Sequence, residues 1–343
     1  MAKKVDFYPP LGGAGGVIDK ATSIFNIMIC INLESHNPFF NLAVDEYLLK
    51  NRKEDFLVIG INDTSVIIGK HQIAHREAET GFVTEYNIPV IRRISGGGTV
   101  YHDRGNINYS FIINSESGKQ IDFRKYTLPV ISFLSSVGAD AKFEGKNDLI
   151  IDGFKISGNA EHVFRNRVLH HGTLLFDADL DLLKGSIRKD TTGYSSRAVV
   201  SNPSPVANLK DRLKNIGDVD EFRSVMINWF LKNMKDAELC ELSGEETISA
   251  ELLAESKYRT WEWNYGYGPE YRFFKTFEIS GLPHKCRLLV KDGIIQDCSI
   301  EGSDEMATIG KKLTGCRHMV PDLAELLRKE KSSITDNDVF NFF

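Results

Sequence analysis

Cysteine is scarce in this sequence. The 343 residues include five cysteines, and no two of them form a Cys-X-X-Cys pair. They stand at Cys30, Cys240, Cys286, Cys298 and Cys316. Such an odd and scattered set argues against a disulfide framework and against a zinc site, and it is typical of a protein from a reducing compartment.

Long apolar runs are missing as well. No stretch approaches the roughly 18 apolar residues that a membrane-spanning helix needs. Near the N-terminus, the glycine-rich run 12–16 stands where a secretory signal would carry its apolar core. No strand is predicted ahead of this run, so we do not interpret it as a dinucleotide-binding loop. We interpret residues 1–23 as a flexible leader and expect a cytoplasmic protein.

Neither sign of charge dominates the sequence. Lysine and arginine total 42 and aspartate and glutamate total 47, which gives a net charge of −5. This balance argues against a general nucleic-acid binder or a membrane-surface binder. The 42% hydrophobic content is ordinary for a globular protein, and the length is sufficient for two domains with a substantial core.

The apolar patterns predict an α+β protein with two domains. Mixed sheets with packed helices are predicted for a catalytic domain at 24–240, and a boundary is predicted at 239–246. A small α+β accessory domain of three short strands and three short helices is predicted at 247–343. The polar stretch 184–209 is rich in Gly, Ser, Pro and Arg, and its length indicates a functional or disordered segment.

Short local signals predict particular turns and one helix start. Asn37 followed by Pro38 is typical of the N-terminus of a helix, with the asparagine as cap. Asp-Gly pairs at 152–153 and 292–293 separate apolar runs and therefore predict two tight hairpins.

The most informative stretch is 92–106, with the sequence RRISGGGTVYHDRGN. Apolar runs at 88–91 and 107–113 predict strands on either side of it. Three successive glycines let a ligand approach the backbone closely, and bare N–H groups in such a loop suit an anion. The alternative is a plain glycine hairpin with solvated arginines. A plain hairpin does not need the polar residues that surround the glycines, which are Arg93, Ser95, His102, Asp103 and Asn106.

Lys155 is the strongest candidate for a catalytic residue. In the strand that follows the predicted turn, Phe154 and Ile156 share one face, and we expect both in the core. Lys155 and Ser157 then point to the opposite side, directly before Gly158. The alternative is an exposed lysine on a solvated sheet face.

Other polar residues are candidates with plainer alternatives. Asn147 and Asp148 precede the hairpin and could simply form a turn, a serious alternative for Asn147. His170 and His171 are adjacent in a predicted strand, so they point to opposite faces and do not form a zinc pair. We expect His171 to line a site. His102 could instead be a hydrogen-bonded interior histidine.

These motifs resemble those of the lipoate–protein ligases, a family of the biotin/lipoate protein ligase superfamily. The stretch 92–106 is similar to the nucleotide-binding signature of that family. GKNDL at 145–149 with KISGNA at 155–160, and then HHGTLL at 170–175, match in the same order. The resemblance runs from about Asn41 to the C-terminus.

The resemblance implies a fold and an activity. It implies a biotin/lipoyl protein ligase-like catalytic domain with a small C-terminal α+β domain. The implied reaction is salvage of lipoate: ATP activates lipoate to lipoyl-AMP, and the lipoyl group is then transferred to a lysine of an acceptor domain. ATP and Mg²⁺ are the implied cofactors, with Asp148 as a candidate ligand of the metal.

The resemblance also implies partners and site residues. The acceptors would be lipoyl domains of 2-oxoacid dehydrogenase acyltransferase subunits and the glycine-cleavage H protein, and we expect a monomer that binds neither nucleic acid nor membranes. Lys155 takes the catalytic role, at the acyl carboxylate and the α-phosphate. The polar stretch 184–209, with Arg188 and Arg197, is implied to close over the adenylate. The implied ATP- and lipoyl-AMP-binding residues are Arg93, Ser95, Gly96, Gly97, Gly98, Thr99, Val100, Tyr101, His102, Asn106, Asn147, Asp148, Lys155, Ser157, Gly158, His171, Gly172 and Thr173.

Several related functions compete with this interpretation. An octanoyltransferase of the same superfamily works through a cysteine thioester, but Cys30 is the only cysteine before Cys240 and lies far from the motifs. A biotin–protein ligase has a Gly/Arg-alternating loop where this chain has SGGG. A lipoyltransferase that uses preformed lipoyl-AMP carries nearly the same motifs and remains open. Intact Lys155 and Asp148 argue against a non-catalytic binding protein.

We therefore predict that the cysteines are dispensable for chemistry. A folded Cys30→Ser variant should transfer lipoate at a rate within about twofold of wild type, because no thioester is needed. Lipoylation of an acceptor domain measures this rate. Complete loss of transfer in a folded variant would restore the thioester mechanism.

Overall fold

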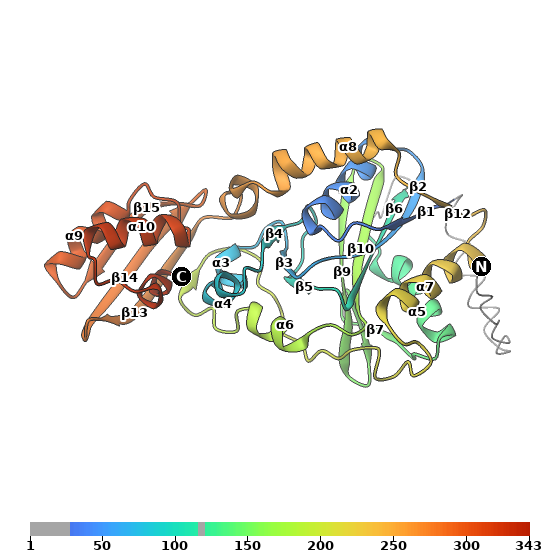
Figure 1. The fold of residues 1–343 in the computed structure, drawn as a ribbon, viewed down its shortest axis with the longest axis horizontal. Helices are drawn as coiled ribbons and strands as arrows, with labels where there is room; N and C mark the ends of the chain where they lie inside the picture. Colours follow the sequence, from blue (N-terminus) through green and yellow to red (C-terminus); the bar gives the residue numbers. More distant parts are fainter. Residues whose placement is uncertain (1–27, 116–120) are drawn as a thin grey trace, which may run out of the picture.

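The body of the protein is built on a mixed eight-stranded sheet (Figure 1). The structure is a computed structural model and describes residues 28–115 and 121–343, so the predicted leader lies outside the described residues. The strands are β1 (Met28–Leu33), β2 (Asp55–Ile61), β6 (Asn106–Asn114), β7 (Lys142–Glu144), β8 (Asp148–Ile151), β9 (Phe154–Phe164), β10 (Arg167–Leu175) and β12 (Glu238–Cys240). Their order is β12-β1-β2-β6-β10-β9-β8-β7. β1 is parallel to β12 and β2, and the other neighbours are antiparallel.

Helices cover both faces of this sheet. They are α2 (Pro38–Asn51) on one face and α5 (Phe123–Ser136) with α7 (Val219–Asn233) on the other. Successive side chains of a strand point to opposite faces, so each inner strand must be apolar on both sides. In β2, Leu57 and Ile59 join the apolar layer under α5 and α7, whereas Phe56 and Val58 join the layer under α2.

The predicted helix start at Asn37 is confirmed. Its side chain accepts hydrogen bonds from the backbone N–H groups of Phe39 and Phe40, at 3.0 and 3.2 Å, and Pro38 is the first helical residue. These bonds satisfy donors that the first turn of a helix leaves free. The cap fixes where α2 begins, and α2 carries Asn41 and Asp45 to the cavity described below.

A second, three-stranded sheet carries the glycine-rich stretch. It has the order β4-β3-β5, with β3 (Ser65–Ile68), β4 (Val90–Arg92) and β5 (Val100–His102), and it is flanked by α3 (Ala74–Glu77) and α4 (Thr80–Glu85). The prediction of a single loop between strands at 88–91 and 107–113 is therefore wrong. β5 pairs with β3 inside that loop, and its three residues are too few to show an alternating pattern in the sequence.

The predicted hairpin at 152–153 is confirmed, but one side chain of the hairpin was assigned wrongly. Asp152 and Gly153 have φ of 53° and 79°, the left-handed conformations of a two-residue hairpin turn. Ile156 is fully buried as predicted, whereas Phe154 is 42% exposed. Phe154 directly follows the turn and pairs with Ile151 at the end of the hairpin, so its strand face does not ensure burial there.

The accessory domain lies at one end of the molecule (Figure 1). Its four-stranded sheet has the order β11-β13-β14-β15, and its helices lie beyond β15 in the sequence. The first strand, β11, comes from the polar stretch 184–209, which sequence reasoning placed in the catalytic domain. The elements are β11 (Tyr194–Ser195), β13 (Tyr271–Ile279), β14 (Leu282–Lys291), β15 (Ile294–Glu301), α9 (Asp304–Leu313), α10 (Val320–Glu330) and α11 (Asp336–Val339). Across the described ranges, no helix is long and apolar enough to cross a membrane.

Packing favours a later domain boundary than the predicted 239–246. The helix α8 (Gly244–Leu253) and the turn after it pack on α2, and Ala250 and Tyr258 belong to the same apolar cluster as α2. The buried carboxylate of Glu46 accepts hydrogen bonds from Lys257 and from the hydroxyl of Tyr258, at 2.7 and 2.6 Å. We therefore propose to place the boundary just before β13.

Arg92 joins three parts of the chain from a fully buried position. Its guanidinium donates to the carbonyls of Gly69, Lys70 and Gln72, at 2.6–3.2 Å. It also donates to the carbonyls of Trp263 and Asn264, at 3.0 and 2.8 Å. Burial lowers the pKa of Arg92 to about 10, so the group keeps its charge at neutral pH.

We predict that Arg92 is essential for stability. Arg92→Met leaves several buried carbonyl groups without donors, so it should lower the free energy of unfolding by about 3 kcal/mol or more. Arg92→Lys should also destabilise, because an ammonium cannot reproduce the planar set of donors. Urea unfolding measures both changes. The exposed Arg287→Met is the control, and a shift below about 1 kcal/mol in Arg92→Met would contradict the prediction.

Candidate active site

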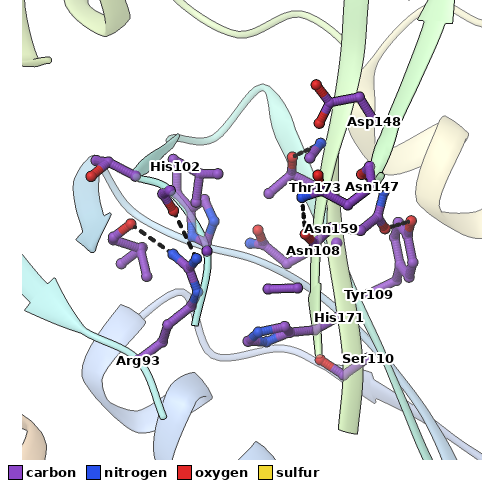
Figure 2. A pocket seen from close by; sticks show the side chains of 18 of the residues that line it. Arg93, His102, Asn108, Tyr109, Ser110, Asn147, Asp148, Asn159, His171 and Thr173 are labelled. Carbon is purple, nitrogen blue, oxygen red and sulfur yellow. Dashed lines mark hydrogen bonds between the residues drawn. The ribbon is translucent and has the colours of Figure 1, made fainter. Parts of the chain in front are cut away.

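A cavity of about 770 Å³ is lined by segments from both sheets, from α2 and from the polar stretch (Figure 2). The structure brings most of the sequence-predicted site residues to its wall. These are Arg93, Gly97, Gly98, Thr99, Val100, His102, Asn147, Asp148, Lys155, Gly158, His171, Gly172 and Thr173. Residues that are far apart in the chain therefore form one site, as the motifs predict.

Five other predicted residues do not line the cavity. Tyr101 lies between Val100 and His102 in β5 and so points to the other side of that strand. Ser95 and Ser157 are buried beneath the cavity wall, at 0% and 1% exposure. Gly96 and Asn106 act within the protein: the Gly96 carbonyl accepts from Arg93, and the Asn106 amide donates to Asn108 at 2.9 Å.

Lys155 lies at the cavity wall as its strand face predicts. Its ammonium lies 2.8 Å from a carboxylate oxygen of Asp148, and both side chains are about one-quarter exposed, at 23% and 27%. Two hydrogen bonds to the polar stretch fix the backbone of Lys155. Its N–H donates to the carbonyl of Pro205 at 2.8 Å, and its carbonyl accepts from the N–H of Ala207 at 3.1 Å. A Cβ atom on Gly158 would lie 3.3–3.4 Å from the end of the lysine side chain, so a glycine leaves this side chain room.

The buried side chain of Arg93 holds the glycine-rich loop, residues 95–99, in shape. Its guanidinium donates to the carbonyls of Ile67, Gly96 and Gly98 at 2.5–3.1 Å, and to the hydroxyl of Ser95 at 2.9 Å. The resemblance implied that Arg93 binds the nucleotide directly. Arg93 is instead almost fully buried, and burial lowers its pKa to about 10. It positions the backbone that faces the cavity.

A chain of hydrogen bonds fixes the orientation of His171. Ser95 Oγ accepts a hydrogen bond from Arg93, which can only donate, at 2.9 Å, and it lies within hydrogen-bond distance of His171 Nε2, 2.6 Å away. The other ring nitrogen of His171, Nδ1, faces a carboxylate oxygen of Asp45 at 3.5 Å. Asp45 is also bound by Ser110 at 2.7 Å. This serine, histidine and aspartate are spaced like a nucleophilic triad, but Ser95 is fully buried and cannot attack a substrate in the cavity.

His170 lies on the other face of β10, as predicted. Its Nδ1 lies 2.8 Å from the buried carboxylate of Glu161. Aromatic rings of Tyr109, Phe111 and Tyr126 surround it at 5.4–6.4 Å. Over residues 28–115 and 121–343, no group of three or more metal-ligating side chains gathers.

His102 is an interior histidine that also touches the cavity. The side-chain amide of Asn62 donates to its Nδ1 at 2.9 Å, which places the imidazole proton on Nε2. Burial, followed by the nearby Arg93 and His171, lowers the pKa of His102 from 6.5 to about 3. The ring is therefore neutral at physiological pH.

Sequence reasoning missed an amide-rich part of the wall. Asn41, Asn62, Asn108 and Asn159 line the cavity together with Tyr109. The hydroxyl of Tyr109 donates to the side-chain oxygen of Asn159. A Cβ atom at position 172 would lie 2.2–2.5 Å from both of these groups, so the glycine of the HHGT motif was the one sequence signal for this contact.

Part of the cavity wall is apolar. Leu33, Leu42, Val58 and Ile67 line it, next to Gly60. An apolar wall of this kind accommodates an alkyl chain, since burial of apolar surface is favourable. Cys30 is not among the lining residues, and burial raises the pKa of its thiol to about 12, which opposes a thiolate.

The low pKa of His102 predicts a loss of stability in acid. Between pH 6.5 and about 3 the unfolded chain binds a proton at His102 that the folded protein does not bind, so stability falls as pH falls through this window. The slope should reach at most about 1.4 kcal/mol per pH unit. Urea unfolding at pH 7, 6 and 5 should show a shallower decline for His102→Asn than for wild type. Exposed His71→Asn is the control, and equal slopes for all three proteins would contradict the prediction.

Known proteins share these features. Residues 37–231 match the family model of the lipoyl protein ligase A/B catalytic domain. Lipoate–protein ligase 1 of Staphylococcus aureus is 33% identical over 90% of this chain and 93% of its own length. A lipoate–protein ligase of Bacillus subtilis is 33% identical over 86% of this chain and 92% of its own.

Solved structures agree with this relationship. A putative lipoate protein ligase of T. acidophilum with bound lipoic acid aligns with a TM-score of 0.59 and 27% identity, over 71% of this chain and 100% of that chain. A lipoate–protein ligase A bound with ATP aligns with a TM-score of 0.60 and 27% identity, over 71% of this chain and 99% of that chain. The chain therefore belongs to the lipoate–protein ligase family.

Proposed function

We propose that this protein activates lipoate with ATP to lipoyl-AMP and then transfers the lipoyl group to a lysine of an acceptor protein. The observation that carries the proposal is the position of Lys155. Its ammonium lies at the wall of one cavity that is lined both by the glycine-rich loop and by apolar side chains. The solved relatives bound with lipoic acid and with ATP support the same pair of ligands.

In the first step, a carboxylate oxygen of lipoate attacks the α-phosphorus of ATP and pyrophosphate leaves. Negative charge is concentrated at the α-phosphate as the two anionic groups approach. The Lys155 ammonium offsets this charge and brings the carboxylate and the phosphate together. N–H groups of the loop that Arg93 shapes complete the phosphate site, and Leu33, Leu42 and Val58 contact the acyl chain.

In the second step, the amine of the acceptor lysine attacks the carbonyl carbon of lipoyl-AMP and AMP leaves. The charge on the departing phosphate lies where Lys155 is fixed, so the same group assists both steps. Neither step needs a covalent bond to the protein. The buried positions of Ser95 and Cys30 agree with this, because neither can reach a substrate in the cavity.

The residues fit Mg²⁺ as a companion of ATP. Asp148 presents a carboxylate at the cavity wall, and one carboxylate together with phosphate oxygens is a typical ligand set for this ion. Because the described residues gather no metal cluster of their own, the phosphates would supply most of the ligands. The bound ion would neutralise phosphate charge, and Asp148 would hold it next to Lys155.

The acceptors we propose are lipoyl domains of 2-oxoacid dehydrogenase acyltransferase subunits and the glycine-cleavage H protein. A structural study of a bi-partite lipoate protein ligase from Thermoplasma acidophilum includes its E2 lipoyl domain, which supports the first of these. We propose a monomeric protein and a cytoplasmic location, in keeping with its few cysteines.

A transferase that uses only preformed lipoyl-AMP is the competing function. Lipoate-dependent exchange of pyrophosphate into ATP separates the two. Exchange by the purified protein is the expected result. Transfer from supplied lipoyl-AMP without any exchange would assign the chain to the transferases instead.

We predict that Lys155→Ala lowers pyrophosphate exchange by about 10²–10³-fold, the usual effect of removing one preorganised group that stabilises transition-state charge. Transfer from supplied lipoyl-AMP should fall too. Lys155→Arg should rescue poorly, because a planar guanidinium is not the same compact cation. Lys142→Ala, at an exposed lysine on β7, is the matched control. Exchange by folded Lys155→Ala within about threefold of wild type would refute the assignment.

A further inference from the structure

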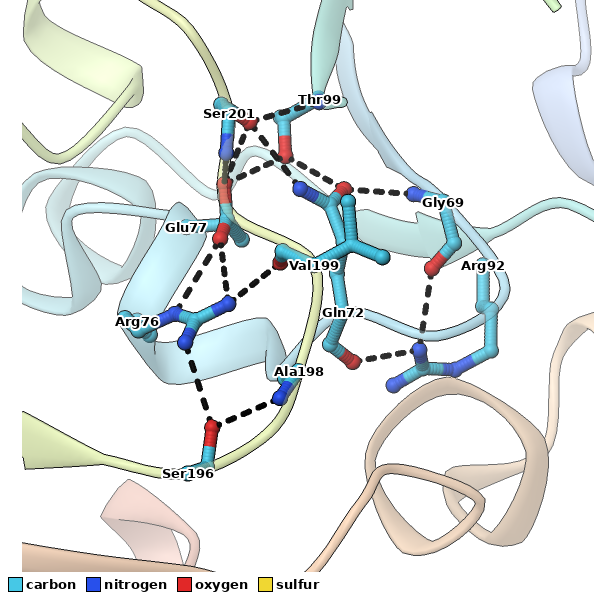
Figure 3. Close-up of polar contacts among 10 residues, drawn as sticks. All are labelled: Gly69, Gln72, Arg76, Glu77, Arg92, Thr99, Ser196, Ala198, Val199 and Ser201. Atoms are coloured by element: carbon cyan, nitrogen blue, oxygen red, sulfur yellow. Dashed lines mark hydrogen bonds and ion pairs between the residues drawn. The ribbon is translucent and has the colours of Figure 1, made fainter. Parts of the chain in front are cut away.

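The segment 196–201 of the polar stretch packs against the glycine-rich loop (Figure 3). The backbone N–H of Thr99 donates to Ser201 Oγ at 2.8 Å. A Cβ atom on Gly98 would lie 3.3 Å from Ser201 Oγ and 3.4 Å from Ser201 Cα. A side chain at position 98 would therefore require the segment 196–201 to shift by a few tenths of an ångström.

The hydroxyl of Ser201 is saturated with hydrogen bonds. It accepts from Thr99 N–H and from the side-chain amide of Gln72, at 2.8 and 3.0 Å. It donates its hydrogen to the carboxylate of Glu77. One donated and two accepted bonds are all that a hydroxyl can make. Ser201 Oγ thus receives the Thr99 N–H of the glycine-rich loop and an N–H of the Gln72 side chain, two donors that a phosphate oxygen could also receive.

The buried helix α3 holds the segment in this position. Glu77 is 2% exposed and also accepts from Thr99 Oγ1 at 3.3 Å. Its neighbour Arg76 neutralises it at 3.2 Å. Arg76 also donates to the carbonyl of Val199 and to Ser196 Oγ, so it holds the segment at two further points (Figure 3).

We propose that Ser201 stands in for a phosphate oxygen and that the segment 196–201 is a latch, held by Glu77, which the nucleotide must displace. This inference rests on the proposed function, which places phosphate on the amides of the glycine-rich loop. A phosphate oxygen is charged and is a stronger acceptor for the Thr99 N–H than a hydroxyl. Opening the latch uses part of the binding free energy, and the apparent affinity for ATP is lower by that amount.

Removal of the latch should therefore tighten nucleotide binding. Ser201→Ala frees the Thr99 amide. Calorimetric titration should then give a Kd for ATP about threefold to tenfold lower than that of wild type. This factor corresponds to the free energy of one net hydrogen bond. Ser201→Thr keeps the hydroxyl and should remain within about twofold. Ser195→Ala, at an exposed serine of β11 outside the cavity, is the matched control. An unchanged or higher Kd for Ser201→Ala would overturn the proposal.

A second measurement tests the latch without nucleotide. Amide hydrogen exchange at Thr99 should be slow in the wild-type protein, several-fold faster in Ser201→Ala and slow again in that variant with ATP. Equal exchange in the two nucleotide-free proteins would overturn the latch. If wild-type protein binds no ATP at all, the proposed function fails, and the nucleotide-free comparison still decides whether Ser201 caps the amide.

The role of Glu77 is tested through its coupling to Ser201. Glu77→Gln removes the charge that holds the hydroxyl, and it should also lower the Kd for ATP. The double variant with Ser201→Ala should bind no more tightly than the stronger of the two single variants, because both open the same latch. Fully additive effects would overturn the assignment of Glu77 as the holding group, and a poorly folded Glu77→Gln leaves the decision to the Ser201 series.

Discussion

Two adjacent guanidinium groups determine the shape of the loops around the cavity. Arg92 and Arg93 are buried, and in the described part of the chain neither forms a salt bridge with a carboxylate. Burial lowers the pKa of each to about 10, so both remain charged. Their charge is satisfied by backbone carbonyls, which must turn inward to reach them. The conformations of the segments 69–72 and 96–98 therefore follow from two cations beneath them.

This arrangement divides the work between positive groups. Arg93 is committed to carbonyls and to Ser95, so it serves as a fixed support. Lys155 has one carboxylate partner and a partly exposed ammonium, so it can exchange that partner for a substrate anion. A compact, rotatable cation suits the reacting centre, whereas a planar, rigid fork suits the task of holding several carbonyls.

The sequence predicted what depends on local geometry. Strand alternation correctly predicted that Lys155 points to the cavity and that His170 and His171 lie on opposite faces. An Asp-Gly pair correctly predicted each hairpin. The same alternation failed at Phe154, because the pattern does not show where a sheet ends. The short strand β5 carries too few residues to be recognised, and so the sequence did not show that the Tyr101 side chain points away from the cavity. The Asn41, Asn62 and Asn159 contacts join distant segments, and the glycine at position 172 is the one local signal for any of them.

The pairing of β11 with β13 makes the polar stretch a tether as well as a cover. Tyr194 and Ser195 are hydrogen-bonded into the accessory sheet, while Ser201 is bound to the glycine-rich loop. The five intervening residues make six Cα–Cα steps, which span about 20 Å when fully extended. If the accessory domain moves farther than this extended length permits, one of two contacts must break. Either Tyr194 and Ser195 leave the accessory sheet, or Ser201 separates from Thr99. The domain and the loop are therefore mechanically coupled through a single strand of chain.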